Sequence, residues 1–381
     1  MSRPSLTGWL AWFGGWSTKA APAPGSDQLS TGQLAWRALA RNRVAMAAAW
    51  VLGLLYLVAL IPEPFATCAA NFRDSAAVAA PPQPVRIWDD GPRLPFVRPL
   101  VAVRHADTLA LVWHEDASRR LTLTLFPRGP EYHLLGAIPC QWRLVGLEGA
   151  VWHPLGTDRI GQDVWSRLVH GARVSLTIGL LGVTLSFILG VLLGAVAAWY
   201  GGWIDGLISR VTDVLISLPA IPIWMGLSAA VPATWPPLGV YLGITVVLSF
   251  MGWTGLARQL RARMLAQKDE DFVTAARLAG ASTSRVLLVH LVPGSISHLI
   301  VAATLAVPGM ILGETALSFL GLGIRPPAVS WGVLLQDAQN LQSLAEMPWL
   351  LTPALAVFVV VLAFNLFGDG LRDALDPHHQ R

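Results

Sequence analysis

The sequence lacks the residue patterns that most often hold a nucleotide, a catalytic metal or an activated serine. A phosphate-binding loop places a lysine after a glycine-rich turn, so that backbone amides and the lysine hold the phosphates. The chain has only two lysines, Lys19 and Lys268, and neither follows a glycine. No His-Glu-x-x-His pair and no Gly-x-Ser-x-Gly turn occurs either. The sequence therefore predicts no catalytic residue, no metal site and no cofactor on this chain.

The most informative polar segment is residues 258–293, which separates two apolar stretches. Acidic residues stand where a helix would begin, Arg277 would fall in its last turn, and Gly280 would follow as a left-handed cap. Ala, Leu and Phe residues give this helix an apolar face, which indicates that another protein packs on it outside the membrane. The residues predicted to couple the chain to that partner are Asp271, Thr274, Ala275, Ala276, Arg277, Gly280, Ala281 and Ser282.

Four other acidic residues are candidates for a gating or a structural role. Glu314 is a charge inside an apolar stretch, where a carboxylate costs about 2.5–3.5 kcal/mol on insertion scales. It is either functional, or it pairs with an arginine or caps a helix break.

Asp158 and Asp163 precede an apolar stretch and are expected to hold its start through salt bridges and caps, together with Arg159 and Arg167. Asp213 lies three residues after Arg210 and is expected to pair with it on one helix face.

Composition and hydropathy place these residues in a membrane protein. Of the 381 residues, 54% are hydrophobic and 13% charged, against roughly 25% charged in soluble domains. A span needs about 20 apolar residues, and six stretches qualify: 44–61, 174–199, 214–231, 238–257, 296–319 and 349–367. The predicted fold is an all-α polytopic membrane protein of six transmembrane helices. The net charge of +4 comes without a basic run interleaved with aromatics, so nucleic acid is not an expected partner.

Arginines and lysines in the short links set the orientation. They gather before the first span and in the link between the fourth and fifth, so both termini and this link are expected on the cytoplasmic side. The expected divisions are a cytoplasmic leader (1–43), a first span (44–61), an extracytoplasmic insert (62–172), a five-helix core (173–371) with its coupling loop (258–293), and a cytoplasmic tail (372–381).

The insert is expected to form a small β unit. Hydrophobic and polar residues alternate over 100–103, 109–113 and 121–125, with turn-forming residues between them. Both cysteines, Cys68 and Cys140, fall in the insert. Either they form a disulfide, which an oxidising compartment permits, or they are two unpaired thiols.

Five segments together resemble the C-type permease subunit of the dipeptide/oligopeptide ABC importers. Residues 274–293 resemble the family's EAA coupling loop, with Thr274, His290 and Val292 departing from it. Residues 155–167 resemble its GTDxxGRDxxSR signature, with Gln162 in place of the usual Arg. The other three are residues 200–205 (YYGGxxD), 316–332 (LSFLGLG-x-PP-x-x-SWG) and 368–377 (GDxLRDxLDP).

The resemblance implies a type I ABC importer permease in the bacterial inner membrane. Such a subunit forms the pathway with a second, homologous permease, and two ATPase subunits bind the ATP and magnesium. An extracytoplasmic binding protein delivers the solute. Peptides are the expected solute, and oligosaccharides are the alternative within the family. The alternative class is a self-sufficient secondary transporter, which often shows internal repeats or ionisable residues at mid-membrane.

Overall fold

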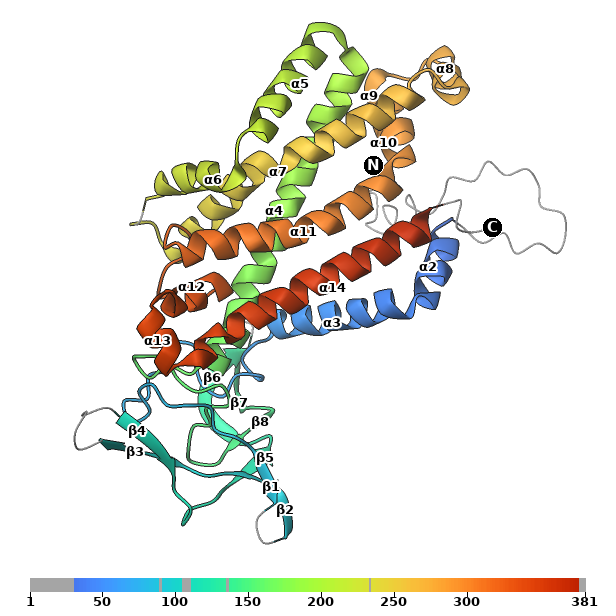
Figure 1. Ribbon diagram of the computed structural model, residues 1–381. Helices are drawn as coiled ribbons and strands as arrows, with labels where there is room; N and C mark the ends of the chain where they lie inside the picture. Colours follow the sequence, from blue (N-terminus) through green and yellow to red (C-terminus); the bar gives the residue numbers. More distant parts are fainter. Residues whose placement is uncertain (1–30, 89–90, 105–110, 135–136, 233, 377–381) are drawn as a thin grey trace, which may run out of the picture.

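The computed structural model describes residues 31–88, 91–104, 111–134, 137–232 and 234–376. Long helices form most of the molecule, and a unit of short strands lies at one end of them (Figure 1). The short helix α8 (Asp271–Leu278) lies at the opposite end. We call these two ends the strand end and the α8 end.

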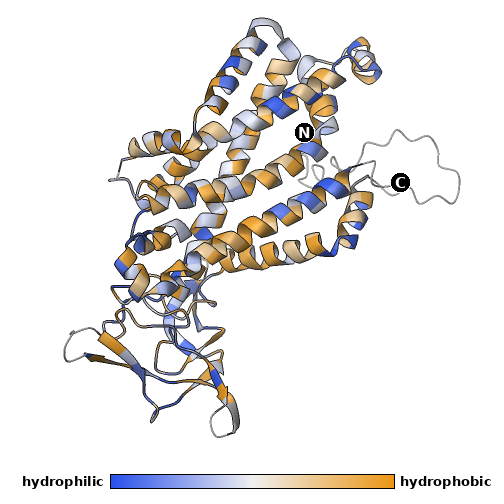
Figure 2. Ribbon diagram, viewed as in Figure 1, coloured by the Kyte–Doolittle hydropathy of each residue, from blue (hydrophilic) through white to orange (hydrophobic). Residues whose placement is uncertain are grey.

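Five helices are long and apolar enough to cross a membrane, and the ribbon of Figure 2 is coloured as hydrophobic along much of their length. They are α3 (Arg43–Leu60), α4 (Val164–Tyr200), α7 (Pro237–Gln267), α11 (Ile296–Phe319) and α14 (Thr352–Leu375). The pair α5 (Gly202–Ser217) and α6 (Ala220–Ala229) is long and apolar enough only when taken together, and its two helices are bent by 95° at a short break, as in a broken span or a re-entrant loop. The prediction of a helical membrane protein is confirmed, and the six predicted spans correspond to five single helices plus this bent pair counted as one span.

The expected third span, 214–231, is wrong as a single helix, because the break between α5 and α6 falls inside it. Leu218 is extended, with φ −87° and ψ 139°, and Pro219 caps the start of α6. A proline disfavours helical geometry in the residue before it, so α5 ends there. Pro222 lies in the first turn of α6, where a missing backbone donor costs nothing.

Helix α4 is the centre of the packing, because it contacts α3, α5, α7, α11 and α12. The main core lies between these helices and includes the fully buried Leu176, Ile178, Leu248 and Ile311. A second core at the α8 end joins α4 and α7 to residues of the link before α11. Helix α4 comes close to α7 at Gly190 and Gly194, where a Cβ atom would meet backbone atoms of α7.

Short helices connect the long ones. The α7–α11 link holds α8, α9 (Thr283–Arg285), the π-helical turn η1 (Val286–Leu291) and α10 (Val292–Gly294). The α11–α14 link holds α12 (Trp331–Gln336), η2 (Asp337–Gln339), α13 (Leu341–Glu346) and η3 (Pro348–Leu351).

The insert forms a β unit of paired strands. The strands are β1 (Arg86–Trp88), β2 (Pro92–Val97), β3 (Leu100–Arg104), β4 (Leu111–Glu115), β5 (Leu121–Leu125), β6 (Arg128–Leu134), β7 (Ile138–Trp142) and β8 (Val145–Leu147). Four of them make an antiparallel sheet in the order β1-β2-β5-β8, and β3–β4 and β6–β7 form separate pairs. Of the alternating segments, 100–103 lies in β3 and 121–125 in β5, whereas residues 109–110 lie outside the described residues.

The structure shows Cys68 and Cys140 as free cysteines, so the disulfide alternative is wrong. Cys68 is buried against helix α4, with its Sγ 3.4 Å from the Ser166 Oγ. Cys140 lies on β7, paired with Tyr132 of β6. The two thiols therefore have separate surroundings, a relation that sequence spacing does not reveal.

Several expected boundaries also shift by part of a helix. The insert ends at Asp163 because α4 begins at Val164, and the coupling link begins at Lys268 because α7 continues to Gln267. Helix α14 extends through the start of the expected tail to Leu375. Residues 1–30 of the expected leader lie outside the described residues, and the rest contains helix α2 (Thr31–Arg41), which packs on α14.

The close approach of α4 to α7 yields a prediction. In Gly194→Ala, the new Cβ would lie 2.6 Å from the carbonyl oxygen of Ala257. Helix backbones cannot yield as side chains do, so we expect a loss of about 1–3 kcal/mol, seen as a lower melting temperature of the purified protein. Gly182→Ala is the control, because its nearest neighbour is the Met310 Sδ at 3.4 Å. Equal melting temperatures for both variants would contradict the packing described.

Candidate functional site

Helix α8 is a complete small helix with its own start and stop signals. Asp271 lies in its first turn and Arg277 in its last, where each charge favours the helix dipole. Gly280 has φ +80° and closes the helix: its N–H donates to the Arg277 carbonyl (2.9 Å), and the Ala281 N–H donates to the Ala276 carbonyl (3.0 Å). This pair of bonds is a Schellman motif, so the C-terminal end of α8 is fixed by local geometry.

One side of α8 is anchored to the helical core. Val273 is fully buried in the second core, and Ala276 and Ala281 pack against the same cluster. The Arg277 guanidinium lies over the Trp199 ring, 4.5 Å from its centroid, at the last turn of α4. Lys268 donates to the carbonyls of Ala198 and Trp199 at 3.2 and 2.7 Å. These contacts tie α8 to the end of α4.

The opposite side of α8 exposes two large apolar side chains among polar ones. Leu278 is 84% exposed and Phe272 is 46% exposed. Of the residues predicted for coupling, Asp271, Thr274, Ala275 and Ser282 share this outward side. Ala276 and Ala281 instead face inward. The predicted set thus divides into an anchoring group and an exposed group.

The acidic residues of α5 pair with α7. Asp213 accepts from Arg258 at 2.6 Å, and Asp205 accepts from Arg261 at 2.6 Å. The expected pair of Asp213 with Arg210 is wrong, because Asp213 reaches across to the neighbouring helix. These bonds fix the broken span against α7 at the α8 end of the molecule.

Glu314 lies in a buried cluster of serine hydroxyl groups. It is fully buried on α11 and accepts hydrogen bonds from Ser175 of α4 (2.9 Å) and Ser318 (2.8 Å). The same two hydroxyls accept from the backbone N–H groups of Trp331 (3.1 Å) and Ile324 (3.0 Å) in the α11–α14 link. The structure gives Glu314 serine partners in place of the arginine considered from the sequence.

At the strand end, Asp163 and Asp158 hold the start of α4. The Asp163 carboxylate caps the helix by accepting from the Ser166 N–H (2.6 Å), and it also contacts the Thr67 hydroxyl (3.0 Å). Asp158 accepts from two backbone N–H groups of its own turn and pairs with Arg167 at 2.6 Å. We call residues 153–167 the outer shoulder.

His153 completes this shoulder. Its Nδ1 lies 3.0 Å from Asp163 and its Nε2 lies 3.5 Å from Asp74, and the ring is buried. Burial alone lowers the pKa of His153, but the hydrogen bond and charge of Asp163, with those of Asp74, outweigh it and raise the pKa above its usual value. The histidine therefore joins the start of α4 to the insert, and its two carboxylate neighbours favour its protonated form.

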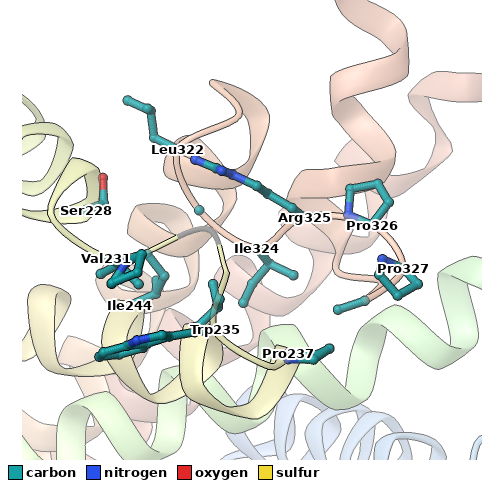
Figure 3. Close-up of a pocket in the computed structure, with 14 residues that line it drawn as sticks. Ser228, Val231, Trp235, Pro237, Ile244, Leu322, Ile324, Arg325, Pro326 and Pro327 are labelled. Atoms are coloured by element: carbon teal, nitrogen blue, oxygen red, sulfur yellow. The ribbon is translucent and has the colours of Figure 1, made fainter.

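A small pocket of about 150 Å³ lies between the α6–α7 link and the α11–α12 link. Figure 3 shows Val231 and Trp235 on one side and Arg325 with Pro326 on the other. Arg325 donates to the Gly321 carbonyl at 3.2 Å and closes its own link. Most of the lining is apolar, so we interpret this pocket as part of the packing contact between the two links.

Family models match most of this architecture. The model described as a binding-protein-dependent transport system inner membrane component matches residues 190–381, about half of the chain and including α8 and Glu314. The chain belongs to this family of transport permeases. The N-terminal transmembrane domain of oligopeptide transport permease C matches residues 30–82. The resemblance to the C-type permease is thereby confirmed.

Curated relatives agree with this assignment. The dipeptide transport system permease protein DppC of Bacillus subtilis (strain 168) is 40% identical over 231 residues, covering 60% of this chain and 70% of the relative. DppC of Alkalihalophilus pseudofirmus is 38% identical over 236 residues, covering 62% and 74%. Among solved structures, the inward-facing MetNI methionine ABC transporter covers 55% of this chain and 96% of its own, with 17% identity and a TM-score of 0.43.

Sequence reasoning missed the residues that anchor the permease's exposed helix. Trp199 stands at the end of an apolar stretch, and its ring supports Arg277. The sequence shows only an aromatic residue at the end of an apolar stretch. This position does not reveal whether the ring contacts lipid or a cationic side chain. Leu278 and Phe272 were expected only as part of an apolar face, and exposure now identifies them as its most prominent members.

The His153 geometry predicts pH-dependent stability of the permease. Because the folded pKa is raised, the contribution of His153 is fully present below about pH 6.5, the pKa of an unperturbed histidine, and is lost as pH rises through the folded pKa. His153→Gln should therefore lower the melting temperature most at acidic pH. His133→Gln, at an exposed position on β6, is the control. A deficit in His153→Gln that is the same from pH 5.5 to pH 9 would contradict the ion-pair account.

Proposed function

We propose that this permease is one of two transmembrane subunits of a peptide importer and that α8 docks on an ATPase subunit. The observation that carries the proposal is the apolar, exposed side of α8, held on a rigid anchor. Large exposed apolar side chains beside buried anchors are typical of protein–protein contacts. Peptides are the proposed solute because the curated relatives are named dipeptide permeases.

The anchor explains how movement of the docked helix would reach the membrane. Displacement of α8 would act on α4 through Val273, through Arg277 on Trp199, and through Lys268. Since α4 packs on most of the other long helices, it would carry the displacement to the strand end. ATP, bound with magnesium on the partner subunits, would supply the energy for alternating access.

Charge supports the orientation that this docking needs. Arginines and lysines gather at the α8 end, which is the pattern of a cytoplasmic face: Arg37, Arg41, Arg43, Arg258, Arg261, Arg263, Lys268, Arg277 and Arg285. Helix α2 and the end of α14 lie at this same end (Figure 1). We therefore place both ends of the described chain in the cytoplasm and the strand unit outside the bacterial inner membrane. A second permease and a solute-binding protein complete the proposed assembly.

The docking proposal predicts that Leu278→Asp uncouples the importer. A carboxylate placed in an apolar interface should weaken docking by about 2 kcal/mol or more, which is roughly 25-fold. We expect peptide uptake in membrane vesicles to fall accordingly, while the amount of folded permease stays unchanged. ATPase activity would no longer respond to solute.

Two further variants make this test specific. Leu341→Asp is the matched control, because Leu341 is 81% exposed but lies on α13 at the other end of the molecule. It should transport normally. Ala276→Asp is unsuitable as a docking variant, because Ala276 packs inward and its substitution would disturb the anchor. Normal uptake by Leu278→Asp would overturn the docking proposal.

A further inference from the structure

A cleft of about 660 Å³ opens at the strand end, away from α8. Five parts of the chain form its walls: the start of the insert, the outer shoulder, the α11–α12 link, α12 and η2. Its charged side chains are Arg73, Arg159, Arg167, Asp158 and Asp337, and its amide side chains are Asn71, Gln162 and Gln336. The volume is large enough for a small ligand, since such sites occupy roughly 300–1,000 Å³.

Two guanidinium groups in this cleft are available for a ligand. Arg167 already pairs with Asp158 at 2.6 Å and lies 3.7 Å from Asp337. By contrast, Arg73 and Arg159 are exposed, and the salt bridges within the described part of the chain include neither of them. A guanidinium offers a planar fork of donors that matches a carboxylate.

Gln162 adds an unused polar group. The residue is only 9% exposed. Its backbone N–H donates to the Asp158 carboxylate, and its backbone carbonyl accepts from the Asp158 N–H. Its side-chain amide has no hydrogen bond to the described residues, although it lines the cleft. The amide is not among the buried polar atoms that lack a partner, so a ligand or solvent in the cleft can reach it. This is also the position where the family signature has an arginine.

The cleft also carries the opposite charge. The Asp337 side chain is 44% exposed, and its nearest cation, Arg167, is committed to Asp158 at a shorter distance. A ligand with an ammonium group could therefore be held at Asp337 while its carboxylate meets the arginines. Charges of both signs in one cleft suit a zwitterion better than a simple anion.

We propose that this cleft binds a short zwitterionic peptide, with its carboxylate against Arg73 and Arg159 and its ammonium group at Asp337. The choice of a peptide rests on the proposed function, whereas the selection for a carboxylate rests on the cleft itself. The site would hold the solute at the outer face of the permease, next to the link that Glu314 fixes in place.

A cysteine reporter in the assembled complex tests the cleft directly. Asn71 lines it and is exposed, so Asn71→Cys in a Cys140→Ser background places a reactive thiol at the site, while Cys68 stays buried. The measured quantity is the rate of thiol modification by a neutral maleimide, with and without dialanine. Dialanine amide, which lacks the carboxylate, is the matched probe. The background chain without Asn71→Cys gives the rate of any other labelling.

We expect dialanine to slow modification and dialanine amide to need a roughly tenfold higher concentration for the same protection. Arg73→Gln/Arg159→Gln should abolish this difference. Arg104→Gln/Arg119→Gln, which removes two exposed arginines that do not line the cleft, should preserve it. Gln162→Arg should improve protection by dialanine, because it adds a third guanidinium.

Three results would overturn the inference. They are equal protection by both probes, no protection by either, and protection only by a solute-binding protein, which would make the cleft a protein contact. None of these results depends on the docking of α8. Failure of the cleft proposal is therefore distinguishable from failure of the proposed function, which uptake by Leu278→Asp measures.

Discussion

The structure depends on α4 more than on any other element. This helix has 37 residues, and at 1.5 Å per residue it is about 55 Å long. Asp163 caps one end, where His153 and the Asp158–Arg167 pair bind the insert to it. At the other end Trp199 supports Arg277 of α8. One continuous helix thus joins the outer shoulder to the exposed helix.

Satisfied polar groups allow this helix and its neighbours to lie in lipid. Within a bilayer, backbone and side-chain polar groups need partners inside the protein. Glu314 meets this requirement with two serines, one of them on α4, and through them it fixes the α11–α14 link. The cleft at the strand end borders this link, so the hydrogen bonds of Glu314 and the two serines also help to shape the cleft. Any helix movement during a transport cycle would have to leave these hydrogen bonds around Glu314 in place.

Local signals in the sequence predicted the local features. The limits of α8 follow from Asp271 and Gly280, because dipole and cap preferences act within one turn. Five of the spans follow from apolar length alone. The break before Pro219 was missed because prolines also occur inside intact transmembrane helices.

Features that depend on residues far apart in the sequence could not be predicted from such local signals. Ser175 reaches Glu314 across 139 positions of sequence. Whether Ala276 or Leu278 faces outward depends on where the second core lies. The central claim, that the exposed side of α8 contacts an ATPase, is tested most directly by a photo-crosslinking amino acid at position 278, followed by purification of the tagged permease and mass spectrometry. The account predicts a crosslink to a chain with a phosphate-binding loop. A crosslink only to lipid, or to a second copy of this chain, would contradict it.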